Sequence, residues 1–147
     1  MNLRLVLILI AAACTSAFRA DETKDTAKKD LEALQGEWKL VSATRDGKTM
    51  PTDDVKVMKC TIKGDKFTIT RDGKVVEEGA VKLDAAKKPR EIDLPLGDGK
   101  KTALGIYELS GGKYKMCYSP PGKDRPKDFE AKEGTGHTLS VWERERQ

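Results

Sequence analysis

Short segments with two-residue alternation of apolar and polar side chains run through most of this chain, and they constrain its fold more than any other feature. In the clearest example, Met58, Cys60 and Ile62 alternate with lysine and threonine. This period is typical of antiparallel strands that have one buried face and one wet face. The pattern predicts strands over residues 37–45, 56–63, 66–71, 74–83, 90–94, 102–109, 113–118 and 138–145.

Turn signals separate these segments at regular intervals. Asp-Gly pairs begin at Asp46, Asp72 and Asp98, a spacing of 26 residues, and each is followed by lysine. Asp-Gly favours tight hairpins because glycine accepts positive φ without strain. About eight short sequential strands form a stable sheet most readily by closing into an up-and-down barrel, which removes the exposed edges. We therefore predict an all-β fold, an antiparallel barrel of about eight strands, with a two-sheet sandwich as the alternative.

Two stretches fall outside the strand pattern of the predicted domain, which we place at residues 30–147. Residues 26–35 predict a short N-terminal helix, with Leu31 and Leu34 on one face and Gly36 just past its end. The polar residues 18–29 predict a flexible leader before the domain. Residues 119–137 form a long connection, either a functional loop or a surface excursion, since structureless connections beyond roughly 12–15 residues are unusual in compact domains.

The N-terminus has the pattern of a secretion signal. Arg4 precedes an apolar run over residues 5–13, and small residues follow it. The run is shorter than the roughly 20 apolar residues that a transmembrane helix needs. We expect a signal peptide at residues 1–17 and a periplasmic or secreted protein. The alternative is a lipoprotein anchored to the membrane through Cys14, although Ala11 stands where the lipoprotein signal usually has leucine.

Charge and cysteine content narrow the choice of partners. The formal net charge is +4, but lysines alternate with acidic residues along the chain, so we expect no nucleic-acid partner. Cys60 lies in phase with an apolar face, whereas Cys117 lies out of phase with Tyr114 and Met116. Because successive side chains of a strand point to opposite faces, the two cysteines should point in opposite directions. We therefore predict two free thiols.

The sequence offers little catalytic chemistry. The chain has one histidine, His137, in a turn rich in glycine and threonine, and it has no Gly-x-Ser-x-Gly elbow for a nucleophile. A single histidine also argues against the usual zinc sites. We expect no metal, no cofactor and no catalytic residue, and a non-enzymatic role.

The candidate ligand-binding residues are Arg125, Tyr107, Tyr118 and Phe129. Arg125 lies in the long connection, where it could bind an anionic group with two hydrogen bonds. The alternative, which we favour, is that Arg125 fastens this connection to a carbonyl or an acidic side chain of the barrel. The two tyrosines are candidates for polar contacts at a barrel mouth, unless Tyr107 faces outward.

A family resemblance covers most of residues 34–146. Gly36, Glu37 and Trp38 match the Gly-x-Trp opening of lipocalins. Together with the segments 34–39, 62–67, 105–109, 115–118, 120–122, 125–129 and 136–137, the chain resembles a planctomycete family of small, uncharacterised secreted domains with a lipocalin-like fold. The resemblance implies structural roles for Gly36, Trp38 and Arg144, with the arginine packed over the tryptophan. It implies no activity.

These observations lead to two expectations for function. The first is an exported binding module that holds a small apolar or amphipathic ligand in or at the mouth of the barrel, a role that a barrel of about eight strands allows. The second is an extracytoplasmic protein-interaction or envelope-structural domain that acts through residues 119–137. We expect a membrane partner only if Cys14 is lipidated.

Overall fold

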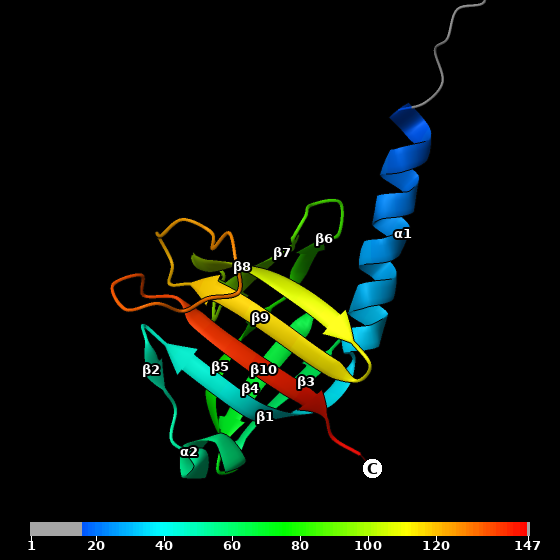
Figure 1. Cartoon of the computed structure of the whole chain (residues 1–147). Coiled ribbons are helices and arrows are strands. Elements are labelled where there is room, and N and C mark those ends of the chain that lie inside the picture. Colours follow the sequence, from blue (N-terminus) through cyan, green and yellow to red (C-terminus); the bar gives the residue numbers. More distant parts are fainter. Residues whose placement is uncertain (1–15, 147) are drawn as a thin grey trace, which may run out of the picture.

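The structure, a computed structural model, describes residues 16–146 (Figure 1). The predicted signal peptide lies outside the described residues apart from its last two positions, and so does Cys14. The described chain contains two helices and ten strands. They are α1 (Ser16–Leu34), β1 (Gly36–Arg45), β2 (Lys48–Thr49), α2 (Thr52–Lys56), β3 (Met58–Lys63), β4 (Lys66–Arg71), β5 (Lys74–Ala80), β6 (Lys82–Asp84), β7 (Arg90–Leu96), β8 (Lys101–Ser110), β9 (Lys113–Ser119) and β10 (Thr138–Arg144).

Eight of these strands form a closed antiparallel barrel, which confirms the predicted fold class. Neighbouring strands follow the order β10, β9, β8, β7, β5, β4, β3, β1, and β1 then pairs with β10. The closing ladder is long, running from Trp38 opposite Arg144 to Arg45 opposite Thr138. The short strands β2 and β6 pair with β1 and β7, respectively. Closure leaves neither β1 nor β10 as a free edge.

The barrel is weakest between β5 and β7, where Gly79 opposite Leu96 is the single residue pair in register. A Cβ atom at position 79 would lie 2.2 Å from the Pro95 carbonyl oxygen and 2.9 Å from the Phe67 ring. Only glycine therefore permits the two strands to approach at this point. The β4–β5 ladder also has a β-bulge between Ile69 and Thr70.

The tight turns follow the Asp-Gly signals at two of the three positions. Asp46 and Gly47 have φ of 48° and 79°, and Asp72 and Gly73 have φ of 51° and 78°. Positive φ at both central residues is the geometry of the favoured two-residue hairpin. The third pair lies in a four-residue connection, because β7 ends at Leu96 and β8 begins at Lys101.

The helices differ most from the prediction. Helix α1 begins at Ser16, so helical backbone covers residues 18–29, for which the sequence predicts a flexible leader. This stretch has three lysines and two alanines, which favour helix, but has few apolar residues to indicate a buried face. Helix α2 was not predicted, because five mostly polar residues show no helical period. The predicted strand 74–83 is interrupted at the buried Val81, whose amide donates to the Asp65 carbonyl.

Candidate functional site

The two ends of the barrel differ in what covers them. Figure 1 shows α1 at one end and α2, with the β1–β2 hairpin, at the other. We call the first the closed end. We call the second the mouth, and it also carries the connections 97–100 and 119–137.

A cavity of about 860 Å³ occupies the mouth. Ligand pockets in proteins typically have about 300–1,000 Å³ and mostly apolar walls. Its wall is mainly apolar and includes the three methionines of the described chain, with Leu40, Ala43, Met50, Pro51, Met58, Ile69, Val76, Met116 and Trp142. Its polar lining residues are Arg45, Asp46, Lys48, Thr49, Asp54, Glu77, Tyr118, Thr138 and Ser140. The interior of this barrel is therefore not filled by its own side chains at this end.

A second cavity of about 200 Å³ adjoins the first. The two share Arg45, Ile69, Glu77, Met116 and Tyr118 as lining residues. The smaller cavity extends toward the rest of the barrel interior, where it is lined by Ile62, Phe67, Val81, Leu94, Leu96, Ala103, Tyr114, Pro120 and Pro121. An elongated apolar molecule that enters from the mouth would find further apolar wall here.

The closed end is packed around Trp38. This side chain is 1% exposed, and its indole Nε1 donates to the Leu34 carbonyl at 2.8 Å. The guanidinium carbon of Arg144 lies 4.4 Å from the centre of the Trp38 ring. Arg144 also donates to the backbone carbonyls of Gln35, at 2.6 Å, and Ala33. The structure thus brings together Trp38 and Arg144, two of the residues to which the resemblance assigns structural roles.

Gly36 completes this arrangement. Its φ is +110°, and a Cβ atom at this position would lie 3.1 Å from Nη1 of Arg144. Glycine is therefore required both by the backbone and by the guanidinium beside it. All three residues with predicted structural roles lie at the closed end, away from the cavity.

Tyr107, a predicted ligand contact, also lies at the closed end. It is fully buried, and its hydroxyl donates to the Asp30 carboxylate of α1 at 2.7 Å. Arg90 contacts the same carboxylate oxygen at 2.9 Å. Burial, reinforced by the hydrogen bond and charge of Asp30, raises the pKa of the Tyr107 hydroxyl. Tyr107 thus joins α1 to the barrel and does not line the cavity.

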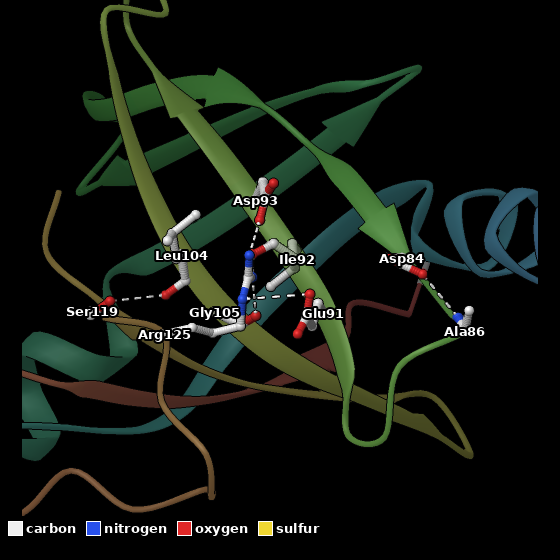
Figure 2. A network of polar contacts seen from close by, with 9 residues as sticks. All are labelled: Asp84, Ala86, Glu91, Ile92, Asp93, Leu104, Gly105, Ser119 and Arg125. Atoms are coloured by element: carbon white, nitrogen blue, oxygen red, sulfur yellow. Dashed lines mark hydrogen bonds and ion pairs between the residues drawn. The ribbon is translucent and has the colours of Figure 1, made fainter. Parts of the chain in front are cut away.

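Arg125 fastens the long connection to the outside of the barrel (Figure 2). Its Nη1 donates to the carbonyls of Ile92, at 3.0 Å, and Gly105, at 2.8 Å. Its Nη2 donates to Asp93 at 2.7 Å, and its Nε lies 3.6 Å from the Glu91 carboxylate. This geometry is that of the anchoring alternative considered above, and it places Arg125 on β7 and β8 outside the cavity lining.

Other contacts hold the connection 119–137 against the barrel. The Lys115 ammonium lies 4.3 Å from the centre of the Phe129 ring, which is half-buried. The Cys117 thiol donates to the Glu130 carbonyl at 3.4 Å, and the Gly47 amide donates to the Ala131 carbonyl at 2.6 Å. The connection therefore covers the outer face of β9 and supports the β1–β2 hairpin at the mouth. Of the four predicted ligand contacts, Tyr118 is the one that lines the cavity.

Both described cysteines are free, as predicted, and both are buried. Cys60 belongs to the hydrophobic core, whereas Cys117 lies on the opposite strand face beneath the connection 119–137. Burial raises the pKa of the Cys60 thiol to about 12. Burial also raises that of Cys117 to about 11, partly opposed by hydrogen bonding with the Glu130 backbone. Both groups are therefore protonated near neutral pH, which makes them poor nucleophiles.

Sequence reasoning missed most polar residues of the cavity. Arg45 ends β1 in phase with Ala43, and Ser140 and Thr138 lie in phase with Trp142 on β10. Strand parity was thus the available signal for these three. Met50 and Asp54 had no such signal, because they reach the cavity from the β2–α2 segment, whose path the sequence does not reveal.

Three comparisons with known proteins were made, and no family model, no curated protein and no solved structure matches this chain. Within residues 16–146, no helix has the length and apolar character needed to cross a membrane.

Proposed function

We propose that this protein is a non-enzymatic binding module that holds a small apolar or amphipathic ligand in the cavity at the barrel mouth. The single observation that carries the proposal is the cavity of about 860 Å³ with its largely apolar wall. Methionine side chains are flexible and polarisable, so a wall containing three of them adapts to ligands of different shape. Burying a ligand's apolar surface there would contribute about 25 cal/mol per Å² before the cost of association.

The cellular setting of this role is part of the same proposal. The basic and apolar pattern of residues 1–17 supports export, with the ligand bound in the periplasm or outside the cell. The segments within residues 34–146 that resemble the planctomycete family of lipocalin-like secreted domains support membership of that family.

The alternative role, protein interaction through residues 119–137, has weaker support. That connection is tied to the barrel by Arg125, and Phe129 packs beneath the Lys115 ammonium. Its contacts favour a structural part in shaping the mouth. The interaction role remains a prediction.

The experiment that tests binding uses Nile red, an uncharged probe whose fluorescence rises and shifts to the blue in apolar surroundings. We expect saturable binding of one probe per barrel. Ala43→Phe should weaken it at least tenfold, because Ala43 is 6% exposed and lines the cavity. Val41→Phe is the matched control, since Val41 lies on the same strand and is 45% exposed.

The control variant should bind the probe as the unaltered protein does. Thermal unfolding of both variants verifies that each remains folded. Absence of saturable binding to the unaltered protein, or equal binding by folded Ala43→Phe, would contradict the proposed function.

A further inference from the structure

The charges at the rim of the cavity are unevenly distributed. Arg45, the last residue of β1, lies opposite Lys48 of β2 in the hairpin ladder, and both line the cavity. This hairpin therefore places two cationic side chains at one side of the mouth. Both are exposed, so their charges are accessible to a molecule that enters the barrel.

The nearby acids on the same side are already engaged. Asp46 accepts a hydrogen bond from the Gly136 amide at 2.8 Å, and Asp54 forms an ion pair with Arg71. Within the part of the chain that the structure describes, neither Arg45 nor Lys48 forms an ion pair. The hairpin thus carries positive charge that no carboxylate of residues 16–146 neutralises in an ion pair.

One contact orients the Arg45 guanidinium. Its Nε donates to the Thr138 hydroxyl at 3.1 Å, and Thr138 is 8% exposed. A guanidinium has five N–H donors in a fixed planar fork, and this bond uses one of them. The remaining donors suit an anionic group with two oxygens, which accepts two parallel hydrogen bonds from such a fork.

Glu77 is the acid that opposes this arrangement. It lies on β5 and lines the cavity, and it forms no ion pair with any described residue. Glu77 lines both cavities together with Arg45, but its carboxylate forms no ion pair with Arg45 or Lys48 among the described residues. Water at the open mouth screens the Glu77 charge more effectively than it screens an anion in direct contact with Arg45. The hairpin side therefore favours an anion even though Glu77 is present.

The apolar wall begins directly beside these cations. Ala43 precedes Arg45 on the same face of β1, and Met50 follows the hairpin, its amide donating to the Ala43 carbonyl at 2.8 Å. From this combination we propose that the cavity selects a single-chain amphiphile with an anionic head group. The head group binds Arg45 and Lys48 at the rim, and the apolar chain lies along the methionine-containing wall. This inference rests on the proposed function, because it needs the same cavity.

The test compares three probes that share one apolar chain: dodecanoate, dodecanol and dodecylammonium. Each is titrated by displacement of Nile red, dodecanoate and dodecylammonium below their micelle concentrations and dodecanol below its solubility limit. We expect dodecanoate to bind about tenfold more tightly than dodecanol, the effect of roughly one charge-assisted contact, and dodecylammonium to bind most weakly. Arg45→Gln and Lys48→Gln should each reduce the preference for dodecanoate over dodecanol.

Lys63→Gln is the matched control, because Lys63 is an exposed lysine at the closed end, where β3 turns into β4. It should not alter the preference among the probes. Equal affinity for all three probes, or a preference for dodecanoate that survives Arg45→Gln and Lys48→Gln together, would overturn the inference while leaving the proposed function intact. Failure of every probe and of Nile red to bind would overturn both.

Discussion

The guanidinium of Arg144, near the end of the chain, lies 4.4 Å above the indole ring of Trp38, near the start of the first strand. These residues are also directly opposite in the ladder that closes the barrel. The contact therefore joins barrel closure to the packing of α1, because Arg144 donates to the Gln35 carbonyl that follows the helix.

Removing this side chain should destabilise the whole barrel. A cation–π contact is worth about 0.5–2 kcal/mol, and loss of the hydrogen bonds to Gln35 and Ala33 adds to it. We expect Arg144→Ala to lower the free energy of unfolding by about 1–3 kcal/mol, measured by urea denaturation. Arg146→Ala, at an exposed neighbouring position, should change it by less than about 0.5 kcal/mol. Equal stability of the two variants would show that the contact contributes nothing.

Arg125 should matter for stability and not for binding. Its guanidinium satisfies two backbone carbonyls and the Asp93 carboxylate, and a lysine ammonium cannot reproduce that planar geometry. We expect Arg125→Lys and Arg125→Ala each to cost about 1–3 kcal/mol and to speed amide hydrogen exchange in residues 119–137. Nile red affinity should stay unchanged in both. A large loss of affinity in a folded variant would restore Arg125 as a ligand contact.

The buried Cys60 thiol predicts a loss of stability at alkaline pH. Its pKa is about 12 in the native state, against 9.0 for an unburied thiol, so above pH 9.0 the unfolded chain has lost a proton that the native state retains. The contribution of the protonated Cys60 thiol to the free energy of unfolding is fully present below pH 9.0 and is lost as pH rises toward 12. One such thiol lowers the free energy of unfolding by up to about 1.4 kcal/mol per pH unit in this range.

The measurement is urea unfolding at pH 7.5 and at pH 10 for the unaltered protein and for Cys60→Ala. The variant leaves a small void, which lowers stability equally at both pH values. The free energy of unfolding of the variant should therefore decrease less between pH 7.5 and pH 10 than that of the unaltered protein. Some decrease remains in both proteins, because burial also raises the pKa values of Tyr107 and Tyr114. If the free energy of unfolding of both proteins decreased equally between pH 7.5 and pH 10, Cys60 would have no part in the alkaline loss of stability.

The sequence predicted the barrel well because its strands follow simple local rules. Strand β4 has the predicted bounds, and β3 begins two residues later than predicted, at Met58. Alternation and Asp-Gly turns act over a few residues, so one sequence suffices to identify them. The same parity rule places Tyr118 in the cavity, in phase with Tyr114 and Met116.

The remainder of the site depends on contacts between distant segments. The sequence contains no local signal that Tyr107 reaches Asp30 of α1, or that Arg125 crosses to β7 and β8. The Asp46-Gly47 turn pairs Arg45 with Lys48 locally, but the contact of Arg45 with Thr138 depends on the pairing of β1 with β10. Such arrangements follow from barrel closure, which a linear pattern does not specify.

The central claim is that the barrel mouth holds a small molecule, and native mass spectrometry tests it most directly. The protein would be purified without denaturation or detergent and measured beside Ala43→Phe. The account predicts an excess mass on the unaltered protein that is lost on unfolding and is absent or strongly reduced in the variant. A folded, unaltered protein that carries no added mass and takes up neither Nile red nor dodecanoate would contradict it.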